Sequence, residues 1–159
     1  MTAAVLTVSD SSASGDRQDL SGPAVKALLE RHKFRIVGTQ VVGDEQSAIQ
    51  EAIVELASRA QLVVTTGGTG IAERDVTPEA TTAVCSRLIE GVAERMRAVG
   101  TQSTALAALS RGVCGICGSA LVLNVPGSPH GASESLAAVL EILPHALDIL
   151  AGKTAHQQS

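Results

Sequence analysis

The sequence lacks tryptophan and tyrosine, and Phe34 is the only aromatic residue among 159. This argues against a binding site built on aromatic stacking, so a nucleotide base would need walls of aliphatic side chains or backbone. The chain also lacks an excess of basic residues, because its formal net charge is −4 at pH 7. It therefore has no global positive field to attract nucleic acid or an acidic membrane. Any anionic ligand must be held locally, by backbone N–H groups, a few arginines or a metal ion.

Long hydrophobic runs are also missing. No apolar stretch reaches the roughly 18 residues that indicate a membrane span, and strand-like sequence begins at Ala3 without the basic segment of a secretory signal. We therefore expect a soluble cytoplasmic protein. The composition, 45% hydrophobic and 18% charged, indicates one globular domain over residues 1–159, with residues 152–159 as a flexible tail.

Cysteine is scarce, with an odd count of three. Cys85 stands alone, whereas Cys114 and Cys117 form a CxxC pair, a spacing found in zinc and redox sites. Zinc would usually need about four ligands, and the chain has no second pair. The pair also lies in strand-like sequence, where residues three apart are separated by roughly 10 Å, beyond disulfide reach. We expect reduced thiols that pack in the core, in preference to a metal or redox role.

Apolar, β-branched runs alternate with helical patterns along the chain. The predicted strands are 3–9, 34–42, 61–66 and the two arms of a hairpin, 112–117 and 120–124, which turns at Gly118-Ser119. The first two predicted helices are 21–32, with Ser21 as its cap, and 46–60. A third is capped by Thr77 and runs towards Arg87, and a fourth spans about 90–99 and stops at Gly100. A short helix at 103–110 follows, and the last helix runs from Ser133 to Leu150 with a kink at Pro144.

This alternation places the chain in the α/β class. Short loops between strands and helices predict right-handed crossovers and a mostly parallel sheet that is covered on both faces, and the hairpin makes the sheet mixed. In such sheets ligands bind beyond the carboxyl ends of the strands. Asp10, Asp44 and Asp75 each follow a different predicted strand. Polar, glycine-rich loops are common in any protein, but a carboxylate after three separate strands favours a site at this edge.

The loop after the third strand, TTGGTGIAERDVTPEAT (65–81), is the most distinctive. It lacks the lysine of a Walker A loop, and Glu73 stands where a dinucleotide fingerprint has its third glycine, so both motifs are disfavoured. What remains is a loop that can turn N–H groups and threonine hydroxyls towards an anion. Arg74-Asp75 follows, either as a solvated ion pair or as part of a magnesium site with Asp44, and the residues alone leave both interpretations open.

At these residues the chain resembles the MoaB/Mog family of molybdenum-cofactor proteins, which includes molybdopterin adenylyltransferases and the matching domain of gephyrin. The glycine loop is similar to the family signature. VLTVSDS, GDEQ, LSRGVCGI and LVLNVPGSP also occur in the family's order, before a closing LPHALDIL. The resemblance runs from about Val5 to Leu150, and it implies a three-layer α/β/α sandwich that forms a homotrimer.

The resemblance also implies a reaction. ATP and molybdopterin give adenylylated molybdopterin and pyrophosphate, Mg²⁺ is required, and the product is handed over to a molybdenum-insertion protein. The attacking group is the terminal phosphate of molybdopterin, whose second pKa of about 6 leaves it largely anionic, so no strong general base is needed. Metal ions and oriented N–H donors supply positioning and charge neutralisation instead.

By the same resemblance, Asp44 and Asp75 are the expected catalytic and metal-binding residues, acting through magnesium and orientation rather than proton abstraction. The substrate-binding residues that it implies lie in three loops: Ser9, Asp10 and Ser11; Thr66, Gly67, Gly68, Thr69, Gly70 and Arg74; and Asn124, Pro126, Gly127 and Ser128.

The chain departs from the family pattern in several places. Gly43 stands where relatives often have proline, and basic residues often found in relatives are missing at Cys117, Ser119 and His130. If those positions touch phosphates, we expect either a lower affinity or substitution by Arg17 and Arg111. Two interpretations stay open: an adenylyltransferase, which the carboxylate pair favours, and a module that binds molybdopterin or its precursor without transfer. A scaffold role is disfavoured because the sequence shows no linker or second module.

Overall fold

The computed structural model describes residues 1–153. In chain order its elements are β1 (Thr2–Val8), α1 (Asp10–Ala13), α2 (Ser21–Arg31), β2 (Arg35–Val42), α3 (Gln46–Ala57), β3 (Leu62–Thr66), α4 (Thr77–Val84), β4 (Arg87–Leu88), α5 (Glu90–Ser103), the 3-10 helix η1 (Ala105–Leu109), β5 (Cys114–Cys117), β6 (Ala120–Val125), α6 (Pro129–Ala137) and α7 (Leu143–Leu150).

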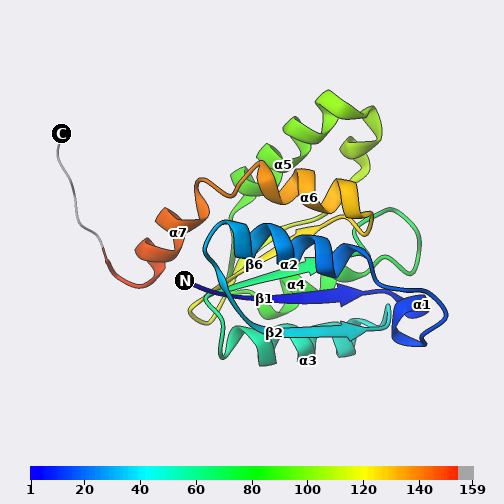
Figure 1. The fold of residues 1–159 in the computed structure, drawn as a ribbon, viewed down its shortest axis with the longest axis horizontal. Helices are drawn as coiled ribbons and strands as arrows, with labels where there is room; N and C mark the ends of the chain where they lie inside the picture. Colours follow the sequence, from blue (N-terminus) through cyan, green and yellow to red (C-terminus); the bar gives the residue numbers. More distant parts are fainter. Residues whose placement is uncertain (154–159) are drawn as a thin grey trace.

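The strands form one sheet in the order β2-β1-β3-β6-β5-β4. Figure 1 shows β2 and β1 side by side at one edge of this sheet. β1, β2, β3 and β6 run parallel to one another. β5 pairs antiparallel with β6, and β4 pairs antiparallel with β5 at the edge of the sheet. The mixed, mostly parallel sheet predicted from the sequence is therefore confirmed. The hairpin between β5 and β6 is confirmed as well.

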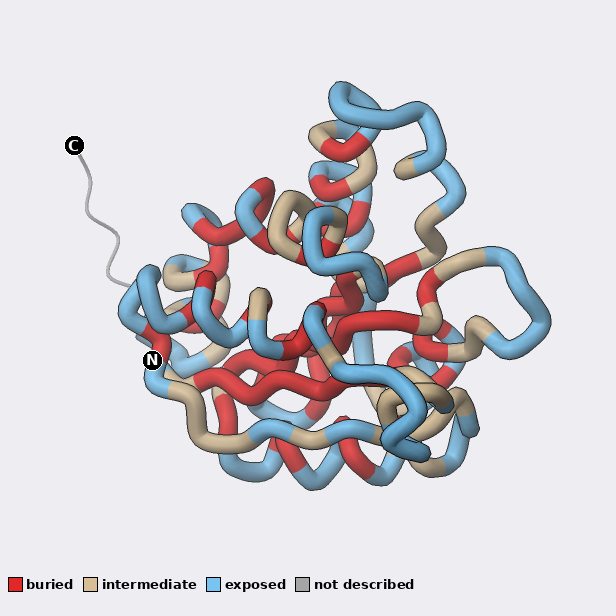
Figure 2. The backbone as a smooth tube through the Cα atoms, turned by 45° about the vertical axis from the view of Figure 1, so that its right-hand side comes forward, coloured by how far each residue is buried: buried red, intermediate tan, exposed pale blue. Residues whose placement is uncertain are grey.

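Helices cover both faces of the sheet and complete the three-layer α/β/α arrangement. α2, α5, α6 and α7 lie on one face, and α3 and α4 on the other (Figure 1). The central strands β1, β3 and β6 are buried along nearly their whole length (Figure 2). Their sequences are almost continuous apolar runs, which is what strands covered on both faces require.

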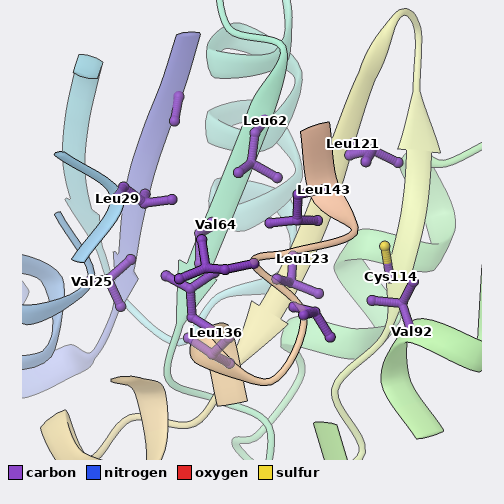
Figure 3. Close-up of a cluster of buried hydrophobic side chains, with 14 of the residues drawn as sticks. Val25, Leu29, Leu62, Val64, Val92, Cys114, Leu121, Leu123, Leu136 and Leu143 are labelled. Atoms are coloured by element: carbon purple, nitrogen blue, oxygen red, sulfur yellow. The ribbon is translucent and has the colours of Figure 1, made fainter. Parts of the chain in front are cut away.

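Each face has its own hydrophobic core. The smaller core lies under α3 and includes Ile49, Ile53 and Leu56. The larger core joins the sheet to α2, α5, α6 and α7, and the residues labelled in Figure 3 belong to it: Val25, Leu29, Leu62, Val64, Val92, Cys114, Leu121, Leu123, Leu136 and Leu143. Burial of each large aliphatic side chain contributes roughly 1.5–3 kcal/mol, so the two cores hold the strands and their ends in a fixed register.

The carboxyl ends of the four parallel strands lie at one level. The register pairs Val8 with Val42, Thr7 with Thr66, and Thr66 with Val125. The loops after β1, β2, β3 and β6 therefore open on the same edge of the sheet, where α1 also lies in Figure 1. This is the edge at which the sequence predicted a site.

Two predicted helix caps are wrong. Ser21 is the first residue of α2, and the carboxylate of Asp19 accepts the hydrogen bond from the Gly22 backbone N–H (3.0 Å). Thr77 is the first residue of α4, and its hydroxyl donates to the carbonyl of Gly67 (2.9 Å). The start of α2 is thus bonded by Asp19, two residues before Ser21, and the Thr77 hydroxyl joins α4 to the glycine loop instead of capping the helix.

Two predicted helix ends and the single long last helix are also wrong. α4 ends before Arg87, which lies in β4, and α5 continues beyond Gly100. The predicted last helix is in fact two: α6 begins at Pro129, and Pro144 lies in the first turn of α7 instead of at a kink. The first N–H groups of a helix have no partner within it, so proline is tolerated there without losing a hydrogen bond.

The CxxC pair lies in β5, as predicted. Cys114 belongs to the larger core and Cys117 to the smaller, so the two side chains point to opposite faces of the sheet. Burial raises the pKa of Cys114 to about 12 and that of Cys85 to about 11, which keeps these thiols protonated near neutral pH. All three cysteines are free. Cys114 and Cys117 are buried, which confirms the packing role predicted for the pair, and a disulfide between them is excluded.

No helix within residues 1–153 is both long enough and apolar enough to span a membrane. Of the predicted tail, Gly152 and Lys153 are described, and their N–H groups donate to the carbonyls of Ile149 and Asp148. Residues 154–159 lie outside the described residues.

Candidate active site

A cavity of about 350 Å³ lies at the carboxyl edge of the sheet. Its walls come from the segment Ser9–Ser21 after β1, from the glycine loop after β3, and from the segment Gly127–Pro129 after β6. Asp44, which follows β2, completes the lining. Loops from four parallel strands thus meet at one cavity, as the topology requires.

A second cavity, of about 580 Å³, adjoins the first. The two have four lining residues in common: Gly68, Asp75, Gly127 and Ser128. The second cavity extends from there towards α5, η1 and α6, and aliphatic residues form much of its wall: Leu106, Ala107, Leu109 and Pro126. A polar cavity and a more apolar one therefore meet beside Asp75.

The glycine loop has a backbone that only glycine adopts easily. Gly67 and Gly68 have φ values of +98° and +64°. The Gly67 N–H donates to the carbonyl of Val125 (3.1 Å), and an added Cβ at Gly67 would collide with the carbonyl oxygen of Val8. A Cβ at Gly127 would lie 3.2 Å from the Gly67 Cα. The loops after β3 and β6 therefore touch backbone to backbone, without side chains between them.

Asp44 is held by reciprocal hydrogen bonds with Asp10. The Asp10 N–H donates to Oδ2 of Asp44 (3.1 Å), and the Asp44 N–H donates to Oδ1 of Asp10 (2.7 Å). These bonds join the loops after β1 and β2. They also explain the place of Asp10, which lines an outer hollow beside Asp44 instead of the first cavity.

Asp75 is held within its own loop, where its Oδ2 accepts a hydrogen bond from the Ala72 N–H (2.9 Å). Asp44 and Asp75 each use one carboxylate oxygen in this way, and both line the first cavity. Residues 1–153 contain no group of three or more His, Cys, Asp or Glu that could hold a metal. Two carboxylates nevertheless fit Mg²⁺ that arrives with phosphate oxygens and waters, since Mg²⁺ usually takes only one or two protein carboxylates at phosphate sites.

The structure divides the predicted site residues among the cavities. Those that line the first cavity are Ser9, Ser11, Asp44, Gly67, Gly68, Arg74, Asp75, Gly127 and Ser128. Those that line only the second are Thr69, Gly70 and Pro126. Asp10 lines the outer hollow. The two remaining residues, Thr66 and Asn124, are buried and line neither of the two main cavities.

Asn124 requires a correction, because its amide is fully engaged inside the protein. Its Nδ2 donates to the hydroxyls of Thr65 and Thr81 (both 2.9 Å), and its Oδ1 accepts from the Val113 N–H (3.2 Å). The Thr66 hydroxyl is likewise engaged, since it donates to the carbonyl of Pro126 (3.0 Å). Both side chains form hydrogen bonds between neighbouring segments beneath the site, and these bonds engage the polar atoms that could otherwise contact a substrate.

Replacing Asn124 by alanine should therefore reduce stability strongly. The Thr65 hydroxyl and the Val113 N–H would lose their partner, while the Thr81 hydroxyl would keep only its bond to the Thr77 carbonyl. Each unsatisfied buried group costs about 1–3 kcal/mol. We expect the free energy of unfolding, measured by urea denaturation, to fall by about 3 kcal/mol. Gln40→Ala is the matched control, because the Gln40 amide bonds Glu55 (2.9 Å) on the exposed surface. A similar loss in both variants would contradict the internal role of Asn124.

The two arginines that could replace missing basic residues have different places. Arg17 lines the first cavity. Arg111 does not, since its guanidinium donates to the carbonyls of Gly70 (2.7 Å) and Asp75 (2.5 Å) and pairs with Glu79 of α4. The hydrogen bond from Arg111 lowers the pKa of the Glu79 carboxyl below its usual range. The expectation that Arg111 serves as a phosphate ligand is therefore not supported.

The three positions at which this chain lacks the basic residues of its relatives lie in different parts of the structure. Cys117 is buried at the end of β5, and Ser119 lies in the turn before β6, at the opposite end of that strand from the cavities. Their side chains cannot reach a ligand beside Asp75 in the same chain. His130 is different, because it lines the second cavity.

Among the residues that line the first cavity and were not predicted as site residues are three polar ones from the segment after β1: Ser12, Gln18 and Asp19. Asp19 accepts a hydrogen bond from the Thr7 hydroxyl (2.6 Å) and so ties the start of α2 to β1. A signal was present, because the polar stretch between the first predicted strand and helix is too long for a simple connection. Its composition alone did not indicate which side chains turn inward.

Comparisons with known proteins agree with this geometry. Residues 4–145 match the family described as "Probable molybdopterin binding domain". The chain belongs to the MoaB/Mog family. One relative of this MoaB/Mog chain is the molybdopterin adenylyltransferase of Helicobacter pylori (strain ATCC 700392 / 26695), which is 38% identical over 152 residues, covering 93% of this chain and 86% of the relative.

A second relative is the molybdopterin adenylyltransferase of Escherichia coli K12, 40% identical over 140 residues that cover 85% of the MoaB/Mog chain and 71% of the relative. Among solved structures, the molybdopterin biosynthesis enzyme MoaB from Thermus thermophilus is 46% identical, with a TM-score of 0.89 over 95% of this chain and 96% of that one. The predicted family and fold class are thereby confirmed.

Proposed function

We propose that this protein is a molybdopterin adenylyltransferase of molybdenum cofactor biosynthesis. It transfers AMP from ATP to the terminal phosphate of molybdopterin and releases pyrophosphate. The observation that carries the proposal is the pair Asp44 and Asp75, which comes from separate loops and lines one polar cavity that adjoins a more apolar one. The Helicobacter pylori and Escherichia coli relatives are both named for this activity.

The two cavities suit different parts of the substrates. The first cavity has Arg17, Arg74 and the serine-rich loop in its wall, groups that suit phosphates. The second has the aliphatic wall that a pterin ring needs in a chain with almost no aromatic residues. We place the pterin there and the reacting phosphates in the first cavity, with Asp75 at the junction.

The transfer itself forms one bond and breaks another. A terminal phosphate oxygen of molybdopterin attacks the α-phosphorus of ATP, and the bond from that phosphorus to the β-phosphate oxygen breaks, so that pyrophosphate leaves. The attacking phosphate is largely anionic near neutral pH, because its second pKa is about 6. No side chain has to remove a proton, which fits a first cavity that is lined by Asp44 and Asp75 and by no histidine.

Mg²⁺ is part of the proposal, and Asp44 and Asp75 would hold it through the carboxylate oxygens that their loop hydrogen bonds leave available. Bound Mg²⁺ neutralises the charge on the phosphates and orients them for displacement. The role of the chain is to fix the two carboxylates, and the Asp10–Asp44 and Ala72–Asp75 hydrogen bonds do so before any ligand is present.

The assay that tests the proposal combines purified protein with molybdopterin, ATP and Mg²⁺ under anaerobic conditions. Pyrophosphate should appear in proportion to the molybdopterin consumed, and chelation of the metal should stop its release. If a folded protein binds molybdopterin but releases no pyrophosphate, the chain is a binding module and not a transferase. Equilibrium dialysis of molybdopterin, run beside the assay, separates these outcomes.

The remaining proposals concern assembly and location. We propose that residues 1–159 form one domain that assembles as a homotrimer in the cytoplasm and hands its product to a molybdenum-insertion protein. Exposed apolar side chains near the second cavity support association, since Ile71 is 70% exposed and Leu106 is 72% exposed. Surfaces of this kind often mark contacts with other chains.

A further inference from the structure

Arg111 lies between η1 and β5 and reaches across to the glycine loop, which carries Asp75. Its backbone N–H donates to the carbonyl of Thr69 (2.8 Å), its Nε to that of Gly70 (2.7 Å), and its Nη2 to that of Asp75 (2.5 Å). One residue therefore holds both ends of the segment 69–75. The segment itself contributes no strand or helix that could fix it.

Two further contacts hold Arg111 in place. Its Nη1 pairs with Glu79 in the first turn of α4, which begins where the glycine loop ends. The guanidinium of Arg97 donates to the carbonyl of Gly112 (3.2 Å), next along the chain from Arg111. The planar guanidinium can serve two carbonyls and a carboxylate at once, whereas the single ammonium of lysine lacks this fixed fork of donors.

We propose that Arg111 is a positioning residue that fixes the Asp75 carboxylate at the junction of the two cavities. Arg111 holds the Asp75 backbone through its carbonyl, and the Ala72 N–H holds the Asp75 side chain through its carboxylate. Arg111 therefore acts on the reaction through Asp75 and does not touch a phosphate. Its importance for catalysis rests on the function proposed above, but its effect on the loop does not.

The first test uses the protein alone and compares Arg111→Met with Glu79→Gln. The measurement is amide hydrogen exchange by NMR at Ala72 and Asp75, with Leu121 of the central sheet as reference. Arg111→Met should speed exchange at both loop amides by at least about tenfold and leave Leu121 within about threefold. Glu79→Gln keeps both carbonyl contacts, so it should change the loop amides much less. Unchanged loop exchange in Arg111→Met would overturn the proposal.

The second test is a double-mutant cycle with Asp75→Asn, in which pyrophosphate release is measured. Arg111→Met should lower kcat at least about 30-fold with the molybdopterin Kd within about threefold. In the Asp75→Asn background the same change should cost less than about threefold, because residues that act as a unit are not additive. If Arg111→Met lowered kcat equally in the wild-type and Asp75→Asn backgrounds, or changed only the KM for ATP, Arg111 would be a phosphate ligand. Either result would overturn the positioning role.

The two tests also separate this proposal from the function itself. If the wild-type protein releases no pyrophosphate, the adenylyltransferase proposal fails, and the exchange measurement still decides whether Arg111 fixes the loop. If exchange rises equally at Leu121, Arg111 supports the whole fold and not the loop, and the positioning role is wrong.

Discussion

Asp75→Asn should lower kcat for pyrophosphate release at least about 100-fold while the molybdopterin Kd stays within about threefold. Asparagine keeps the shape of the side chain, and its carbonyl oxygen can still accept the hydrogen bond from the Ala72 N–H. The loop therefore stays in place, and only the negative charge is lost. Each 1.36 kcal/mol of lost transition-state stabilisation is a factor of ten in rate, and metal-dependent charge stabilisation is worth several kcal/mol.

Glu73→Gln is the matched control for this variant. Glu73 is an exposed carboxylate two positions earlier in the same loop, and it lines neither main cavity. We expect its kcat to stay within about twofold of the wild type. If Asp75→Asn retained most of the rate, or if Glu73→Gln lost as much, a special role of Asp75 would be wrong.

Gly67→Ala should lower the free energy of unfolding strongly, because it adds a methyl group where the loop after β3 packs against β1. A left-handed backbone costs a non-glycine residue roughly 1–2 kcal/mol, and at Gly67 the new Cβ would also collide with the Val8 carbonyl. Neither atom is at the end of a flexible side chain, so the strands themselves must move. We expect a loss of at least about 3 kcal/mol in the free energy of unfolding, measured by urea denaturation.

Gly118→Ala separates the two causes. Gly118 also has a positive φ, of +59°, but an added Cβ there meets nothing within 4 Å. It should therefore show only the backbone cost of roughly 1–2 kcal/mol. Equal losses at both positions would mean that the close approach between Gly67 and β1 does not matter for stability.

The sheet and the position of the site could be predicted from the sequence because they depend on local patterns. Apolar runs and helical periodicity indicate the strands and most helices, and parallel strands must end at one edge. That argument alone brings Asp44 and Asp75 to the same edge, and the structure places both in the lining of one cavity. α1 and β4, with four and two residues, are too short for periodicity to reveal.

The direction of individual side chains could not be predicted in the same way. Asn124 ends the predicted strand 120–124, and the family resemblance implies a ligand contact for it. Its partners Thr65 and Thr81 lie 59 and 43 residues away, so only the folded neighbourhood shows that its amide is engaged. The same holds for Arg111, whose partner carbonyl on Asp75 is 36 residues distant.

The order of strands in the sheet has a consequence for the newly synthesised chain. β3 lies at the centre, and its neighbour β6 is made about 60 residues later, after α4, β4, α5 and β5. At roughly 5–20 residues per second, translation of that stretch takes several seconds. During this interval one edge of β3, a strand that is buried throughout in the folded protein, has no partner. Such an edge is a template for pairing with other chains. The growing polypeptide is therefore most prone to aggregate between the completion of β3 and the arrival of β6.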